Sequence, residues 1–222
     1  MIRVYHAYRT NFEKNIHIFE KYKNIKICIS KDLTLLSIMN KDCYDNSYLA
    51  KQCKNNSIDL VVPVSTFNVR NEEWKNTMKI SAIVQALKSI NTKYVLILDG
   101  KDTCILNNLD DEFLKEFEKL DCDILFNMQK LPMPNIIFKD YRHPINAGVC
   151  IGTREALLSF YSECEKVNAK NEYILKNGMP SEQYIIRKTA NDSPLIIKTD
   201  YEMILFTCYS EFLKKETTFY VL

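Results

Sequence analysis

The sequence has only four glycines, and none of them belongs to a recognisable phosphate-binding loop. Neither a Gly-x-Gly-x-x-Gly fingerprint nor a Walker loop is present, which argues against dinucleotide and P-loop chemistry. The absence of a Gly-x-Ser-x-Gly elbow removes support for a serine hydrolase. The histidines (His6, His17 and His143) are dispersed and form no His-x-Asp or His-x-Glu pair, so the pattern does not favour a facial-triad iron site.

Long apolar runs and a dominant sign of charge are also absent. Thirty basic and 28 acidic side chains give a net charge of +2, so the composition shows no nucleic-acid footprint. No stretch approaches the roughly 18 apolar residues of a membrane helix. The N-terminus enters a strand-like pattern at once, which leaves no room for a secretory signal. We therefore expect a cytoplasmic protein with no transmembrane segment.

The eight cysteines include no Cys-x-x-Cys pair, and several lie inside apolar, strand-like runs. Buried, reduced thiols in a cytosolic protein explain this distribution better than zinc sites or disulfides do. An apolar content of 46% is enough for a sizeable core. The length of 222 residues predicts a single domain spanning 1–222.

Strand-like and helix-like segments alternate along the chain. The clearest helix is predicted for 79–90, where Ile80, Ile83, Val84 and Leu87 follow helical spacing. The remaining pattern predicts strands at 2–8, 25–29, 59–64, 94–98, 123–126, 195–197 and 203–208, and helices at 11–22, at 111–120, after Thr153 and after Ser181. The polar stretch that ends near residue 57 shows no clear pattern. Such alternation predicts an α/β fold, a mostly parallel sheet flanked by helices.

The most informative stretch is the apolar run Tyr94 to Leu98, which is followed at once by Asp99, Gly100 and Asp102. Ligands of open α/β sheets bind outside the carboxyl ends of the strands. Hard divalent cations prefer several carboxylate oxygens on such a turn. The pair therefore predicts a metal site, although an ordinary Asp-Gly turn would look the same.

Three further patches have both a functional and a simpler interpretation. Residues 144–152 contain Asn146, Ala147 and Gly148, and their small side chains indicate a close approach to the backbone or a glycine bulge. Glu182 follows Ser181 at a predicted helix start. Its carboxylate either orients an acceptor or is an ordinary acidic residue in the first turn of a capped helix. Residues 198–202 lie between two apolar strands and form either part of a site or a surface turn.

In their order and spacing, these features resemble the glycosyltransferase domain of the procollagen lysyl hydroxylase family and its stand-alone microbial and viral relatives. The features are Asp-x-x-Asp after a strand, Asn-Ala-Gly-x-x-Ile-Gly, Ser-Glu-Gln and Thr-Asp-Tyr-Glu before Leu-Phe. The resemblance covers most of the chain and is strongest from about 79 to 209. It implies a GT-A fold, with a nucleotide-binding half over 1–98 and a metal, sugar and acceptor half over 99–222.

The resemblance implies a retaining, manganese- or magnesium-dependent hexosyltransferase. Such an enzyme moves a sugar from a UDP-sugar to a hydroxyl of a glycan, protein or lipid-linked acceptor. The implied metal ligands are Asp99, Asp102 and Asp200. The implied donor-site residues are Lys79, Asn146, Ala147 and Gly148. Glu182 and Gln183 match the end of an acidic run that handles acceptor or sugar, so Glu182 is the expected catalytic residue.

Three departures from the family pattern matter. Tyr201 replaces the histidine of the metal shell, so Asp200 is expected to take over. The acidic run is reduced to Glu182. Lys101 stands where the family often has an aromatic that stacks on uracil. Lys101 could instead lie near phosphate, and base recognition would then fall to Trp74 or to Tyr8, at the end of the first strand.

Two other functions remain open at this point. A nucleotidyltransferase or phosphotransferase could use the same carboxylate pair on a similar sheet. A nucleotide-sugar-binding module that kept the fold and lost activity would fit Tyr201 and the shortened acidic run. Release of UDP would indicate sugar transfer, whereas release of pyrophosphate from a nucleoside triphosphate would indicate nucleotidyl transfer.

Overall fold

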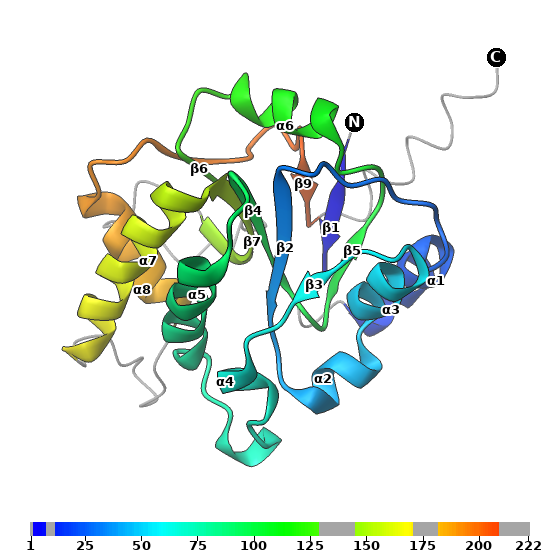
Figure 1. Cartoon of the computed structure of the whole chain (residues 1–222), viewed down its shortest axis with the longest axis horizontal. Helices are drawn as coiled ribbons and strands as arrows, with labels where there is room; N and C mark the ends of the chain where they lie inside the picture. The colour runs from blue at the N-terminus through cyan, green and yellow to red at the C-terminus, as the bar shows by residue number, and fades with distance from the viewer. Residues whose placement is uncertain (1, 8–11, 129–144, 171–181, 209–222) are drawn as a thin grey trace.

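The chain folds into two β-sheets with helices on both sides, as the computed structural model in Figure 1 shows. The structure describes residues 2–7, 12–128, 145–170 and 182–208. The larger sheet has the strand order β3-β2-β4-β7-β6-β8, and the smaller has the order β5-β1-β9. The strands are β1 (Val4–His6), β2 (Leu33–Ile38), β3 (Leu60–Val61), β4 (Tyr94–Asp99), β5 (Thr103–Ile105), β6 (Ile124–Met128), β7 (Ile145–Thr153), β8 (Ile197–Thr199) and β9 (Phe206–Thr207).

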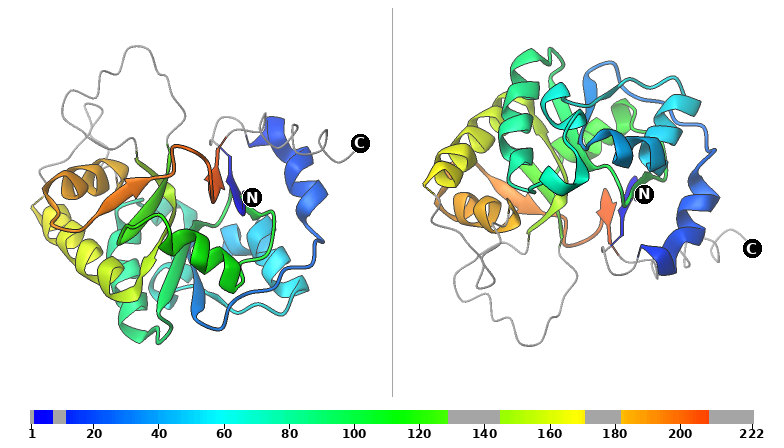
Figure 2. Two further views of the ribbon diagram at one scale, coloured as in Figure 1. Left: turned by 90° about the horizontal axis from the view of Figure 1, so that it is seen from above. Right: turned by 90° about the horizontal axis from the view of Figure 1, so that it is seen from below.

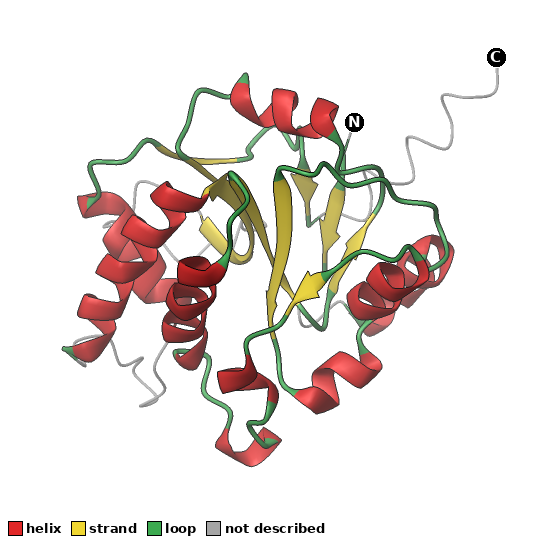
Figure 3. Cartoon of the chain, viewed as in Figure 1, coloured by secondary structure: helices red, strands yellow, loops and turns green. Residues whose placement is uncertain are grey.

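The helices pack against the two sheets in one α/β domain (Figure 3), and α1 packs against the smaller one. They are α1 (Ile16–Tyr22), α2 (Lys41–Asn46), α3 (Tyr48–Asn55), α4 (Val64–Phe67), α5 (Met78–Ser89), α6 (Asp111–Glu118), α7 (Arg154–Ala169) and α8 (Glu182–Asp192), with 3₁₀ turns η2 (Glu13–Asn15) and η3 (Asn71–Glu73). No helix in the described part of the chain has both the length and the apolar character needed to cross a bilayer.

Strand β4 divides the core into two layers. Val95 and Ile97 face the layer that contains α5, α7 and α8. Leu96 and Leu98 face the other layer, which contains α3, α6 and the smaller sheet. Successive side chains of a strand point to opposite faces, so a run of apolar residues is buried on both sides. The prediction of a doubly buried strand at 94–98 is confirmed.

The larger sheet is mixed, which corrects the expectation of a mostly parallel sheet. Pairs β2–β3, β2–β4 and β6–β8 are parallel, but β7 runs antiparallel to both of its neighbours, β4 and β6. Strand β7 begins at the edge where β6 ends, because Met128 pairs with Ile145. Leu98 of β4 pairs with Val149. Residues 146–148 therefore lie at the carboxyl end of β4, beside Asp99.

The structure differs from the strands predicted at 25–29 and 59–64. Residues 25–29 form no strand, and Ile29 makes only an isolated bridge with Leu109. The backbone of this segment is satisfied by side chains instead, since Ile27 N–H donates to Asn56 Oδ1 and Cys28 N–H to Asn108 Oδ1. The second central strand is β2, which lies in the stretch that shows no clear pattern in the sequence. Of the strand expected at 59–64, only β3 forms, and α4 begins at Val64.

Elsewhere the predicted elements are present, with shifted ends. Helices α5 and α6 and the turn-plus-helix η2–α1 occupy the expected positions. Thr153 caps α7, because its hydroxyl accepts the Ala156 N–H. Strand β8 begins at the last residue of its predicted range, 195–197, and continues to Thr199. Strand β9 lies within its predicted range, 203–208. The predicted cap residue Ser181 lies outside the described residues.

The smaller sheet joins the two ends of the described chain. Strand β1 pairs antiparallel with β5 and parallel with β9, and Figure 2 shows β9 lying beside β1. His6 is opposite Thr103 in this register. The pairing therefore holds the end of β1 next to the turn that leaves β4, a contact between residues about a hundred positions apart in sequence.

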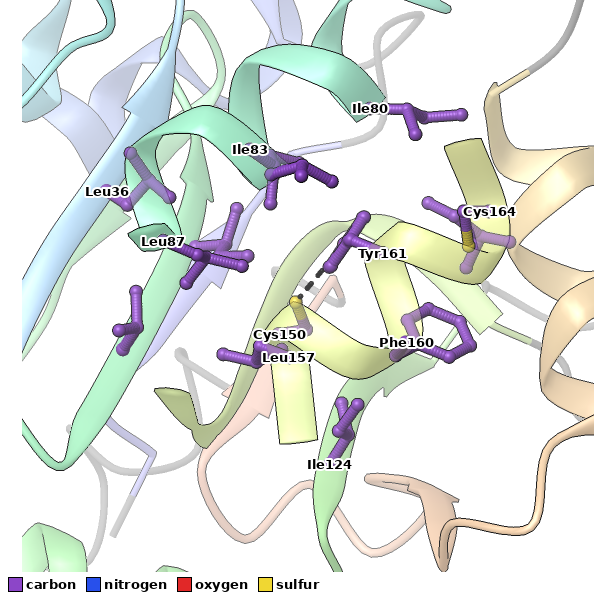
Figure 4. Close-up of a cluster of buried hydrophobic side chains, with 14 of the residues drawn as sticks. Leu36, Ile80, Ile83, Leu87, Ile124, Cys150, Leu157, Phe160, Tyr161 and Cys164 are labelled. Carbon is purple, nitrogen blue, oxygen red and sulfur yellow. Dashed lines mark hydrogen bonds between the residues drawn. The ribbon is translucent and has the colours of Figure 1, made fainter. Parts of the chain in front are cut away.

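The core beneath α5 and α7 contains two of the cysteines. Cys150 Sγ and Tyr161 Oη are 3.6 Å apart and hydrogen-bonded, and Cys164 lies on the same helix as Tyr161 (Figure 4). All eight cysteines are free thiols. Burial raises the pKa of Cys53, Cys150 and Cys164 to about 12. The prediction of buried, unbridged thiols is confirmed for Cys53, Cys104, Cys150, Cys164 and Cys208.

Burial and pKa together predict the order of thiol alkylation. Cys28 is exposed and should react first with iodoacetamide, and the partly buried Cys43 and Cys122 should follow. The five buried thiols should react only in denaturant, because the reagent needs an accessible thiolate. Peptide mass spectrometry at timed intervals measures this order. Rapid modification of Cys150 or Cys164 in the folded protein would contradict the core described above.

Candidate functional site

A pocket of about 540 Å³ lies at the carboxyl edge of β2 and β4. Small-molecule sites commonly have volumes of about 300–1,000 Å³, so this pocket is large enough for a nucleotide or sugar. One wall is formed by the turn after β4 and the end of β1. A neighbouring wall is formed by the start of β7 and the start of α8, and α5 and η3 border the pocket. Ligand sites are expected at this edge of an α/β sheet.

His6, Asp99 and Asp102 converge at the floor of the pocket. His6 Nε2 lies 3.4 Å from Asp99 Oδ2 and 3.3 Å from Asp102 Oδ1. One ligand atom from each residue lies within 4.8 Å of the other two. Neither ring nitrogen of His6 has a hydrogen-bond partner among the described residues, although the side chain is buried. An unpartnered imidazole nitrogen aimed at two carboxylates fits a divalent cation such as Mn²⁺.

Local contacts fix the turn that carries the two aspartates. The Ser47 hydroxyl donates to the Gly100 carbonyl, and Ala7 N–H donates to the Asp102 carbonyl at 2.7 Å. Gly100 itself packs against the Met39 side chain at the end of β2. The two carboxylates are therefore held by neighbouring elements on both sides of the turn, which preorganises them for a cation.

In the absence of a metal, protonated His6 balances the two carboxylates. Burial by itself lowers the pKa of His6, but Asp102 and Asp99 outweigh it and raise that pKa to about 10. Burial similarly raises the pKa of Asp99, yet Lys79 and His6 outweigh it and hold the pKa well below its usual range. A cation at this position would replace the imidazolium proton as the positive partner of both carboxylates.

Lys79 of α5 contacts the other oxygen of Asp99. Its Nζ lies 2.6 Å from Asp99 Oδ1 and 3.5 Å from Glu182 Oε2. Burial lowers the pKa of Lys79, and the charges of Asp99 and Glu182 more than compensate, so the ammonium stays charged. Asp99 thus joins the His6 cluster on one side to the Lys79–Glu182 pair on the other. The structure brings Lys79 into the pocket, and its contact with a donor stays a prediction.

Glu182 and the start of β7 form the wall next to the His6 cluster. Glu182 is the first residue of α8 and is buried. Burial raises the pKa of Glu182 above its usual range, and Lys79 only partly counteracts the shift. Within β7, Asn146 Oδ1 accepts the Gly148 N–H at 2.9 Å. Gln183 Oε1 accepts the Ala147 N–H at 3.3 Å, and this bond ties the start of α8 to β7.

Gly148 is the point of close approach that the sequence indicates. A Cβ added there would lie 2.2 Å from Cε1 and 2.3 Å from Nε2 of His6, and 2.9 Å from Asp99 Oδ2. Such distances are far shorter than any van der Waals contact. Glycine is therefore required at this position because the imidazole passes directly over the backbone of β7.

The structure corrects the expectation that Asp200 completes the metal shell. Its buried carboxylate accepts the backbone N–H groups of Ile204, Leu205 and Phe206 at 2.7–2.8 Å. These bonds occupy both oxygens and fold the turn that leads into β9. Asp200 is not among the described residues that line the pocket. Tyr201 is 53% exposed. Tyr8, a candidate for base recognition, lies outside the described residues.

His6 is the functional candidate that sequence reasoning misses. The sequence signal is a histidine near the end of the predicted first strand. Its meaning depends on the β1–β5 pairing, which no local pattern reveals. His6 lies before the expected division at residue 98, whereas Asp99 and Asp102 lie after it, so the three side chains that could hold a metal come from both halves of the chain.

The wall near η3 carries amide and aromatic groups. Asn40 Nδ2 donates to Asn71 Oδ1 at 2.7 Å, which ties η3 to the end of β2. Trp74 follows η3, lines the pocket and donates from Nε1 to Asn76 Oδ1 at 3.1 Å. Its role as a stacking surface for a base stays a prediction.

Replacing Gly148 by alanine should displace His6 and weaken Mn²⁺ binding by about 10-fold or more, a loss typical of disturbed metal shells. Gly100→Ala is a matched control, because its Cβ meets mainly the flexible end of the Met39 side chain. Titration calorimetry measures both affinities, and circular dichroism checks the fold. Equal Mn²⁺ affinity of Gly148→Ala and Gly100→Ala would refute the cluster geometry.

Asp102 and Asp200 should respond differently to substitution. Asp102→Ala should weaken Mn²⁺ binding by about 10-fold or more, since it removes a ligand. Asp200→Asn should leave Mn²⁺ affinity unchanged but lower the free energy of unfolding by about 1–3 kcal/mol, because an amide cannot accept all three N–H groups. Calorimetry and chemical denaturation distinguish the two effects. A loss of metal affinity in Asp200→Asn would restore Asp200 as a ligand.

Comparison with known proteins adds no family to this description. The sequence matches no model of a protein family. It also matches no curated protein sequence. The function proposed below is therefore supported by the pocket and its side chains, together with the resemblance in motif order that the sequence itself carries.

Proposed function

We propose that this chain is a metal-dependent glycosyltransferase that moves a sugar from a UDP-sugar to an acceptor hydroxyl. The observation that carries the proposal is the His6–Asp99–Asp102 cluster, which shares one pocket with buried Glu182 and with the start of β7. A cation site, a buried acid and a close-approach segment are the three groups that such a transfer needs. The GT-A form of the fold is part of the proposal.

The cluster supplies the cation site. Nε2 of His6, Oδ2 of Asp99 and Oδ1 of Asp102 would hold Mn²⁺ or Mg²⁺, and oxygen-rich sites of this kind suit both ions. When bound, the ion supplies Lewis-acid stabilisation of the charge that grows on a diphosphate leaving group. Lys79 adds a fixed positive charge behind Asp99 and increases the electrostatic stabilisation of the leaving group.

Glu182 is positioned to orient the acceptor. Its carboxyl group lies across the pocket wall from Asp99, with Lys79 between them. In the transfer, the acceptor oxygen forms a bond to the sugar C1 as the bond from C1 to the diphosphate oxygen breaks. The acceptor proton passes to the departing phosphate if attack occurs on the leaving-group face, which gives retention. Glu182 would orient the hydroxyl toward C1 and stabilise positive charge on the sugar ring.

The remaining walls accommodate the other parts of the donor. Ala147 lines the pocket with a small side chain, so a sugar could lie beside it at the start of β7. Trp74 and the Asn40–Asn71 pair offer an aromatic face and amide groups for a uracil ring. This assignment keeps the base at the η3 end of the pocket and the sugar at the α8 end.

A panel of UDP-sugars incubated with Mn²⁺ tests the proposal through release of free UDP. We expect release with at least one donor, loss of release on chelation, and a decrease of about 10-fold or more in Asp102→Ala. The exposed Asp45→Ala provides a control with the same change of charge outside the pocket. Liquid chromatography quantifies UDP.

Two results would replace the proposal by another function. Pyrophosphate release from a nucleoside triphosphate, with no UDP from any sugar donor, would indicate a nucleotidyltransferase. UDP binding that neither Mn²⁺ nor Asp102→Ala changes, again without turnover, would indicate a binding module. Both results are measured on the same preparation, so each one rejects the transferase directly.

A further inference from the structure

Lys101 emerges from the most firmly held turn of the pocket. Its neighbours on both sides are anchored, Gly100 through Ser47 and Asp102 through the backbone of Ala7. The Lys101 side chain itself is exposed and lines the pocket. The base of the side chain is therefore fixed beside the metal cluster, while its ammonium group remains available to a ligand.

Lys101 lines the same pocket as Cys43 and Asn40, which lie near the end of β2. Burial raises the pKa of the Cys43 thiol to about 11, with Asp99 and Asp102 adding to the shift, and the positive charge of Lys101 acts in the opposite direction. The lining of the pocket therefore brings Lys101 together with the metal-ligand candidates Asp99 and Asp102 and with the end of β2.

The contacts of Lys101 differ from those of the other basic groups of the pocket. His6 lies at ion-pair distance from Asp99 and Asp102, and Lys79 lies at ion-pair distance from Asp99 and Glu182. Among the residues that the structure describes, Lys101 pairs with no carboxylate. An exposed ammonium group that lines a pocket without an ion-pair partner can bind an anionic ligand.

We propose that Lys101 binds a phosphate group of the ligand, so that the pocket recognises a diphosphate at two adjacent positive centres, the cation site and this ammonium group. A single phosphate can satisfy either centre, whereas a diphosphate satisfies both at once. The identity of the ligand as a nucleoside diphosphate rests on the proposed function. The binding of a diphosphate by Lys101 does not depend on that function. It also assigns Lys101 a role different from that of an aromatic residue stacking on a base.

The test measures binding of UDP and of inorganic pyrophosphate, each with saturating Mn²⁺, by titration calorimetry. Lys101→Met should weaken both by about 10-fold, the loss expected for one charge-assisted contact. Lys75→Met is the matched control, since exposed Lys75 lies between two pocket residues but is not among the described residues that line the pocket. It should change either affinity by less than about twofold. Mn²⁺ affinity, measured alone, should be the same in both variants.

The two ligands separate failure of this inference from failure of the proposed function. If the wild type binds UDP and pyrophosphate with Mn²⁺ and Lys101→Met binds them equally well, Lys101 is not a phosphate ligand and the transferase proposal stands. If pyrophosphate binds in a Lys101-dependent manner but UDP does not bind, the inference stands and the nucleotide assignment fails. If the wild type binds neither ligand, both are overturned.

Discussion

The architecture of the pocket depends on the approach of one imidazole to two partly buried carboxylates. Asp99 and Asp102 leave the end of the central strand at a position where water has limited access, and unpaired charges in such a position are costly. His6 and Lys79 supply the compensating positive charge from two other elements, β1 and α5. The balance of charge therefore depends on the pairing of the smaller sheet and on the packing of α5. His6, Asp99 and Asp102 are also the residues that could hold a cation.

The antiparallel strand β7 completes the site. A parallel strand beside β4 would present its carboxyl end at this edge, but β7 presents its beginning, where the Asn146–Gly148 segment lies. Gly148 then lets the His6 ring cross the backbone. Helix α8 follows on the same wall and contributes Glu182 at its first turn. The mixed character of the sheet is thus the reason that a small-residue segment and a buried acid face the aspartates.

Local sequence patterns predict the elements whose conformation is determined by residues close to them in the sequence. The apolar run before Asp99, the helical spacing in α5 and the Thr153 cap are each decided by neighbouring residues, and each is observed. Strand β2 is missed because its apolar run is embedded in a polar segment and is specified by pairing with β4. Asp200 is misassigned because its three backbone partners follow it in a turn whose shape the sequence does not state. His6 is missed for the same reason as β2, since its neighbours are determined by strand pairing.

The motif order predicts Asp200 as the third ligand candidate, whereas the structure places His6 beside Asp99 and Asp102. The resemblance places a histidine at the position of Tyr201, and this chain has none there. A cation, however, is sensitive to the atoms around it and not to their order along the chain. His6 brings an imidazole to the aspartates from the first strand, although Tyr201 stands where the resemblance expects a histidine. Asp200 accepts backbone N–H groups in the turn before β9, which itself pairs with the strand that carries His6. Asp200 therefore supports the His6 cluster only indirectly, through the turn that leads into the partner strand of β1.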